Sequence, residues 1–120
     1  MKKIGDGIHC DNAQLKLGGT YDHNFVINGD GLREAAVLQS KESGIRLTCF
    51  TDQPGVQLYV PCYTLHQKGI DGKDYPPYSA VCLETQHYPN AINIEHFLSV
   101  VLKAGENFRS KTLYHFSVMG

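Results

Sequence analysis

The sequence has no apolar run that approaches the roughly 18 residues of a membrane-spanning helix. Its first residues include Lys2 and Lys3, but no apolar stretch follows them, as it would in a secretory signal. These two absences predict a protein that has no membrane partner and lies in the cytoplasm.

Neither sign of charge is in excess. The chain has 11 Lys and Arg against 12 Asp and Glu, a formal net charge of −1, and it has no cluster of basic side chains. Proteins that bind nucleic acids need such clusters to neutralise phosphate groups. We therefore expect no nucleic-acid partner.

Spacings typical of metal ligands are also missing. None of the four cysteines forms a C-x-x-C pair and none of the six histidines forms an H-x-x-x-H pair, which argues against a zinc ribbon or a redox motif. We predict no metal site. The cysteines are expected to be reduced and buried, where a thiol behaves as a small apolar side chain: Cys10, Cys49, Cys62 and Cys82.

The composition that remains is typical of one globular domain over residues 1–120, with 42% hydrophobic and 19% charged residues. Alternating apolar and polar side chains predict strands over residues 45–51, 56–60, 80–85 and 113–118, with weaker candidates at 24–28, 35–39 and 100–102. Short strands at this spacing, joined by glycine-rich turns, predict an all-β antiparallel sandwich or barrel.

Two segments are less regular. Residues 93–102 carry apolar side chains at helical spacing and are expected to form at most a turn of helix. Residues 68–78 are polar and contain Pro76 and Pro77, which predicts an exposed loop between two strands. Such a loop is either a simple connector or the rim of a binding site.

A few polar residues lie within or beside the predicted strands. Gln57 alternates with Val56 and Leu58 and so points away from their face. Alternation alone favours a solvent-facing side chain for Glu84 over a functional one. With Asp22 and Gln86, these residues would suit a polyhydroxylated ligand, because carboxylates and amides form several hydrogen bonds to hydroxyl groups.

Three segments carry a family resemblance. They are Leu-Gly-Gly-Thr-Tyr-Asp-His-Asn-Phe (17–25), Thr-Asp-Gln-Pro-Gly-Val-Gln-Leu-Tyr (51–59) and Cys-Leu-Glu-Thr-Gln-His-Tyr-Pro-Asn-Ala-Ile-Asn (82–93). In this order and spacing they resemble the C-terminal portion of the galactose mutarotases, or aldose 1-epimerases. The resemblance covers essentially the whole chain. It implies an antiparallel β-sandwich of the mutarotase type, of which these residues would form only a part.

The resemblance also implies an activity and a site. The family interconverts the α and β anomers of hexoses such as galactose and glucose without a cofactor or a metal. By position in its motif, Glu84 resembles the general base that takes the proton of the anomeric hydroxyl. Asp22 and Gln57 resemble the residues that bind the sugar.

The chain departs from the family pattern in three respects. The upstream arginine and second histidine with which the family binds sugar are missing. The Asn-His-x-Tyr-Phe-Asn-Leu-type motif that carries the acid histidine does not occur, and His9 lies too close before Asp22 to replace it. After Tyr59, residues 60–62 read Val-Pro-Cys where the family usually has a Gly-Asn pair.

Because acid and base act together in this reaction, we expect the chain alone to be weak or inactive. It would then pair with an upstream mutarotase segment or with itself. The alternatives are a non-catalytic carbohydrate-binding module and an inert truncated product.

Overall fold

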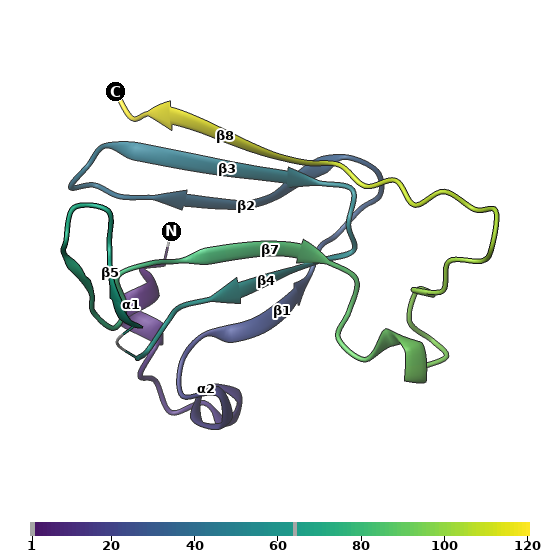
Figure 1. The fold of residues 1–120 in the computed structure, drawn as a ribbon, viewed down its shortest axis with the longest axis horizontal. Coiled ribbons are helices and arrows are strands. Elements are labelled where there is room, and N and C mark those ends of the chain that lie inside the picture. The colour runs from purple at the N-terminus through teal and green to yellow at the C-terminus, as the bar shows by residue number, and fades with distance from the viewer. Residues whose placement is uncertain (1, 64) are drawn as a thin grey trace. The chain divides into compact units, whose positions relative to one another are not determined.

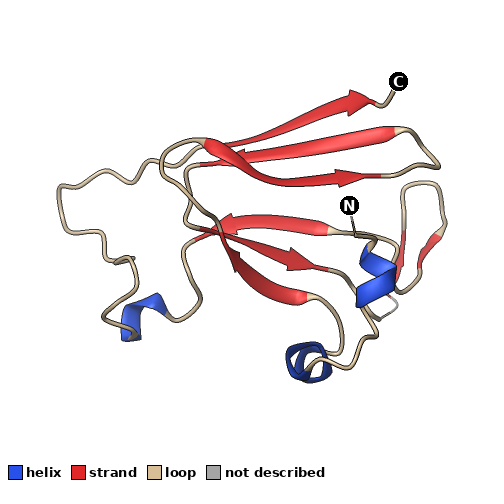
Figure 2. Ribbon diagram, turned by 180° about the vertical axis from the view of Figure 1, so that it is seen from behind, coloured by secondary structure: helices blue, strands red, loops and turns tan. Residues whose placement is uncertain are grey.

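The computed structural model describes residues 2–63 and 65–120, with only the backbone described for residues 65–67. Strands make up most of the regular structure, and the helices are short (Figures 1 and 2). In chain order the elements are α1 (Ile4–Gly7), α2 (Ala13–Gly18), β1 (Asp22–Val26), β2 (Arg33–Gln39), β3 (Ile45–Thr51), β4 (Gly55–Tyr59), β5 (Leu65–Lys68), β6 (Asp74–Tyr75), β7 (Cys82–Gln86), the 3-10 helix η1 (Ala91–Asn93) and β8 (Thr112–Val118).

The described strands form three sheets. Their strand orders are β1-β4-β7, β2-β3-β8 and β5-β6. β3 pairs antiparallel with both β2 and β8, β5 pairs antiparallel with β6, and β4 runs opposite to β1 and β7 (Figure 1). The predicted all-β antiparallel fold is confirmed.

The chain divides into two compact units. The first takes its residues from 1–23 and 57–84, and the second from 24–56 and 85–120. The boundary therefore falls within β1, β4 and β7. The sheet β2-β3-β8 belongs wholly to the second unit and the hairpin β5-β6 to the first. The prediction of one domain over residues 1–120 stays a prediction.

Capping and close packing order the start of the first unit. The Asn12 side chain caps α2 by accepting hydrogen bonds from the backbone N–H groups of Gln14, at 2.9 Å, and Leu15, at 3.4 Å. Gly19 ends the helix in the left-handed region, at φ 69°, where a residue without Cβ is favoured. α2 thereby buries Leu15 and leads the chain into β1.

In the second unit, β3 is the central strand of its sheet. Ile45, Leu47 and Cys49 alternate along β3 and share one face, and Phe116 and Val118 of β8 lie opposite Leu47 and Ile45. Burial falls along this face: Cys49 is fully buried, whereas Ile45 is 48% exposed. Burial also raises the pKa of the Cys49 thiol.

The strands predicted over 45–51, 56–60, 80–85 and 113–118 are confirmed, as are the weaker ones near 24–28 and 35–39. The strand predicted at 100–102 and the turn of helix at 93–102 are wrong. The only helical turn found nearby in the described chain is η1. Phe97 packs its ring against Tyr88, but Leu98 and Val101 are 59% and 55% exposed, and a short helix with little packing is marginal in water.

The loop predicted over 68–78 is partly wrong. Its first residue ends β5, and Asp74 and Tyr75 form β6. Lys68 pairs with Asp74 across the strands, and its Nζ donates to Asp74 Oδ1 at 2.6 Å. The segment therefore contains the turn and the second strand of an exposed hairpin. Alternation cannot predict a strand as short as β6.

The cysteines are free thiols, as predicted, but burial is confirmed only for Cys49. Cys10 is exposed, because it lies in the turn between α1 and α2, and Cys62 and Cys82 are half-buried. Among the described residues, no helix is long and apolar enough to cross a membrane. The cytoplasmic location stays a prediction.

Candidate functional site

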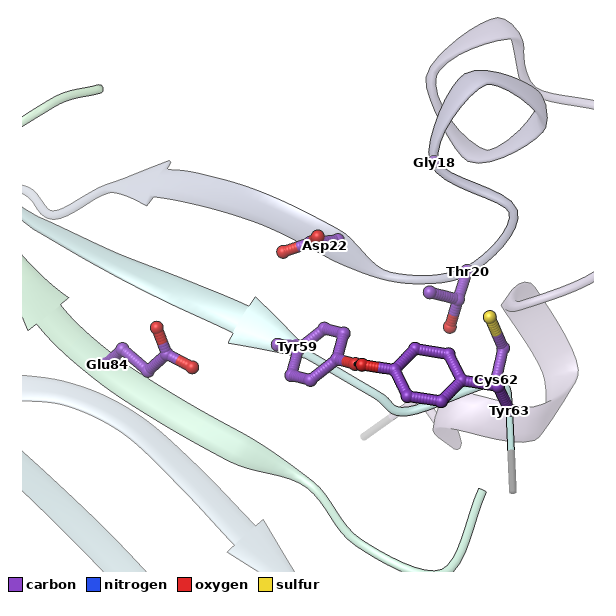
Figure 3. A pocket seen from close by; sticks show the side chains of 7 residues that line it. All are labelled: Gly18, Thr20, Asp22, Tyr59, Cys62, Tyr63 and Glu84. Carbon is purple, nitrogen blue, oxygen red and sulfur yellow. The ribbon is translucent and has the colours of Figure 1, made fainter. Parts of the chain in front are cut away.

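A pocket of about 390 Å³ lies within the first unit. Two of its lining residues, Asp22 and Glu84, carry carboxylates and come from β1 and β7, and Tyr59 comes from β4 (Figure 3). The described lining residues are Gly18, Thr20, Asp22, Tyr59, Cys62, Tyr63 and Glu84. Two of the three residues that the sequence predicted therefore line one pocket.

Gln57 holds one of these carboxylates. Its side-chain Nε2 donates to Asp22 Oδ1 at 2.7 Å. Its Oε1 is buried and has no hydrogen-bond partner among the described residues. A buried acceptor without a partner costs about 1–3 kcal/mol, so such groups are rare in folded proteins. The amide oxygen therefore lacks a donor among the described side chains and backbone groups.

Glu84 has a different environment. The side chain is exposed, as alternation predicts, and it lines the pocket rather than an open surface. Its carboxylate makes no hydrogen bond or ion pair within the described part of the chain. Both oxygens are therefore available to accept a proton or a hydrogen bond from a ligand.

Two tyrosines meet in the pocket. The Tyr59 hydroxyl donates to the Tyr63 hydroxyl at 2.8 Å, and Figure 3 shows the two rings end to end. This hydrogen bond is the main reason why the pKa of Tyr59 is raised to about 12, with desolvation and the nearby Tyr63, Asp22 and Cys62 as further causes. Tyr59 thus remains a neutral donor throughout the neutral pH range.

The residues that depart from the family pattern anchor the wall of this pocket. Val60 is only 2% exposed; its N–H donates to the Tyr21 carbonyl, and its own carbonyl accepts from Thr20 Oγ1, each at 2.8 Å. The Pro61 carbonyl accepts from the Tyr78 N–H at 2.6 Å. Cys62 follows and lines the pocket.

Two further polar residues from the sequence motifs have other partners. The His23 Nδ1 accepts from the Asp22 N–H at 3.1 Å, and its Nε2 lies 3.2 Å from the Gln14 carbonyl. A neutral ring with its hydrogen on Nε2 satisfies both contacts, so His23 fastens β1 to α2. Gln86 belongs to the second unit, where its Nε2 donates to Asn24 Oδ1 at 3.2 Å.

The pocket accepts hydrogen bonds more readily than it donates them. The described residues of its lining include two carboxylates but no Lys, Arg or His. Within the described residues, no group of three or more His, Cys, Asp or Glu side chains could hold a metal ion. Such a site can accept protons from hydroxyl groups, and it repels anions by like charge.

Sequence reasoning did not find Tyr63, Cys62 or Thr20. Tyr59 could have been predicted, because it lies two residues after Gln57 on the same strand and so shares its face. Tyr63 follows Pro61 beyond the end of β4, where strand alternation no longer predicts direction.

Known proteins resemble this chain over most of its length. The family model for aldose 1-epimerase matches residues 2–115. The galactose mutarotase of Bos taurus is 43% identical over 102 residues, or 82% of this chain and 29% of that protein. The galactose mutarotase of Homo sapiens is 40% identical over 121 residues, or 98% of this chain and 34% of that protein. The chain thus spans about a third of the length of these curated relatives.

The fold agrees with the sequence comparison. The crystal structure of an aldose epimerase homologue from C. elegans matches with a TM-score of 0.75 at 30% identity. The match covers 83% of this chain and 30% of that one. The chain belongs to the aldose 1-epimerase family.

Proposed function

We propose that this chain carries the carboxylate side of an aldose 1-epimerase site, which interconverts the α and β anomers of a hexose such as galactose or glucose. Glu84 is the general base, and Asp22 and Gln57 bind sugar hydroxyls. The main support is geometric: Asp22 and Glu84 line one pocket, and Gln57 fixes Asp22. The Gln57 amide thereby positions an acceptor carboxylate, Asp22, for a sugar hydroxyl.

The reaction follows from these groups. Glu84 takes the proton of the anomeric hydroxyl while an acid protonates the ring oxygen, and the bond between the anomeric carbon and the ring oxygen breaks. The aldehyde group rotates, and the reverse proton transfers close the ring with either configuration. Positioned acid and base groups each contribute about 10²- to 10⁴-fold in such reactions. Asp22 and Gln57 would hold the sugar so that its anomeric hydroxyl faces Glu84.

The acid must come from elsewhere. The family's acid-histidine motif is absent from these 120 residues, and no histidine is among the described residues that line the pocket. We propose that a further mutarotase segment supplies it and that the 120-residue chain alone is weak or inactive.

A chimera tests this function. The chimera is the galactose mutarotase of Bos taurus in which this chain replaces the segment that it matches. Polarimetry follows the conversion of freshly dissolved α-D-galactose. We expect the chimera to convert the sugar at a rate near that of the intact bovine enzyme. We expect the reaction with the chain alone to remain near the uncatalysed rate. A soluble, folded chimera without activity would contradict the proposed site. Rapid conversion by the chain alone would contradict the need for an outside acid.

The fixed Asp22–Gln57 pair also supports a second function, a non-catalytic carbohydrate-binding module. This pair is already formed without an acid group. Calorimetric binding of galactose by the chain, together with an inactive chimera, would favour this second function. A chain that binds no hexose and aggregates would instead be an inert product.

A further inference from the structure

Among the described residues that line it, the pocket has more acceptors than donors. The carboxylates of Asp22 and Glu84 can only accept when ionised. The Thr20 hydroxyl is committed to the Val60 carbonyl, and the Gln57 amide donates to Asp22. A monosaccharide presents oxygens that accept as well as hydroxyls that donate, so it needs a donor on the protein.

Tyr63 can supply that donor. Its hydroxyl oxygen accepts the hydrogen bond from Tyr59 at 2.8 Å, which leaves its own hydrogen uncommitted among the described residues. The side chain is 57% exposed and lines the pocket. A hydroxyl that accepts one hydrogen bond donates more strongly to the next.

We propose that Tyr63 donates a hydrogen bond to one oxygen of a neutral monosaccharide whose hydroxyls donate to Asp22 and Glu84, and that Tyr59 is the positioning residue for Tyr63. This inference rests on the proposed function, because it places the sugar in the same pocket. It adds a specificity-determining contact that carboxylates alone cannot make.

The backbone around the pair holds Tyr63 in place. Val60 is fixed by two hydrogen bonds and Pro61 by one, immediately before Cys62 and Tyr63. A donor at the end of an anchored segment loses little freedom when it binds a ligand, and this improves both affinity and selectivity. The Tyr59 hydroxyl then sets the direction in which the Tyr63 hydrogen can point.

The test uses the 120-residue chain and a set of galactose analogues. The probes are D-galactose, its monodeoxy derivatives and the carba-analogue in which a methylene group replaces the ring oxygen. Binding is measured by calorimetry for the unchanged chain and for Tyr63→Phe, Tyr59→Phe and Asp22→Asn. Tyr75→Phe, an exposed tyrosine of β6 that does not line the pocket, is the matched control.

One analogue should lack the sugar oxygen that accepts from Tyr63. We expect the unchanged chain to bind this analogue about 2- to 10-fold more weakly than galactose, because the Tyr63 hydrogen bond is lost. Tyr63→Phe should weaken galactose binding by a similar factor yet leave that analogue unaffected. Tyr59→Phe should reduce discrimination against the same analogue, which a general loss of structure would not do. Tyr75→Phe should bind every probe as the unchanged chain does.

The possible failures are distinct. If Asp22→Asn weakens galactose binding while Tyr63→Phe binds every probe like the unchanged chain, the Tyr63 contact is wrong and the proposed function stands. If Tyr63→Phe weakens all probes by one factor, its effect is structural and the contact is again wrong. If the unchanged chain binds neither galactose nor glucose, the proposed sugar site and this inference fall together.

Discussion

The pocket of the first unit and the sheet β2-β3-β8 of the second differ in what holds their side chains in place. In the pocket, hydrogen bonds already fix Asp22 to Gln57 and Tyr59 to Tyr63. On the sheet, Phe116 and Val118 are 65% and 82% exposed beside Ile45. The polar groups are thus arranged by local contacts, whereas the apolar face remains uncovered at one end.

This difference supports the proposal that further mutarotase sequence completes the chain. Polar side chains on neighbouring strands can satisfy one another locally, but an apolar face is stabilised only when another layer covers it. The relatives are about three times as long as the matched segment. We infer that further mutarotase sequence covers the Ile45–Val118 end of this face and also supplies the missing acid.

The largest predicted effect concerns the base. In the chimera, Glu84→Gln should lower the rate of anomer exchange by about 10²- to 10⁴-fold, because the amide cannot accept the proton. Exchange is measured by NMR magnetisation transfer between the α and β anomers. Glu95→Gln, an exposed glutamate outside the pocket, is the control and should retain full activity. Equal rates for the two variants would exclude Glu84 as the base.

The next effect concerns sugar affinity. Asp22→Asn in the 120-residue chain should weaken galactose binding by about 10- to 100-fold, because a charge-assisted hydrogen bond contributes more than a neutral one. The Asn oxygen can still accept from Gln57, so the fold around the pocket should persist. Calorimetry measures the affinity, with exposed Asp6→Asn as the control. Unchanged affinity in Asp22→Asn would remove this residue from the site.

Two valines of the second unit, Val56 in β4 and Val118 in β8, form a matched pair. Val56 is 3% exposed and Val118 is 82% exposed. In the chain alone, Val56→Ala should lower the free energy of unfolding by about 1–2 kcal/mol, and Val118→Ala by less than about 0.5 kcal/mol. In the chimera, Val118→Ala should cost as much as Val56→Ala. Urea denaturation measures the free energy of unfolding for both variants in the chain alone and in the chimera. If Val118→Ala still lowers it by less than about 0.5 kcal/mol in the chimera, the sheet face around Val118 stays open.

The sequence predicted those parts of the fold that depend on local alternation. β3 and β8 were found almost to the residue, because seven alternating positions carry a clear period of two. The helix α2 was missed although Asn12 and Gly19 are suitable caps, since six residues show too little of a helical period. Residues 93–102 showed the opposite error: the spacing was helical, but no packing surface stabilised a helix.

The candidate site was predictable to a similar extent. Motif resemblance predicted roles for Asp22, Gln57 and Glu84, and these roles stay predictions; alternation correctly predicted an exposed Glu84. Alternation could not show that Glu84 lines the same pocket as Asp22, because strand order is a tertiary property. The Tyr59–Tyr63 contact depends on the chain path after Pro61, for which the sequence carries no periodic signal.

The smallest predicted effect compares one carboxylate in each unit. Hydrogen bonds hold the pKa of both below the ordinary value: the Lys111 backbone N–H is the main cause for Asp52, and the Lys73 side chain for Asp71. A lowered pKa contributes stability above the unfolded-state pKa, and this stability is lost as the pH falls through the folded-state value.

Salt should affect the pKa values of Asp52 and Asp71 differently. About 0.5 M NaCl screens the exposed Lys73–Asp71 pair, but it leaves a backbone hydrogen bond nearly unchanged. Carboxyl carbon NMR titration should therefore show the Asp71 pKa returning toward its ordinary value in salt while the Asp52 pKa stays low. If both values rise together, the link between Asp52 and the Lys111 backbone is electrostatic rather than a fixed contact at the end of β3.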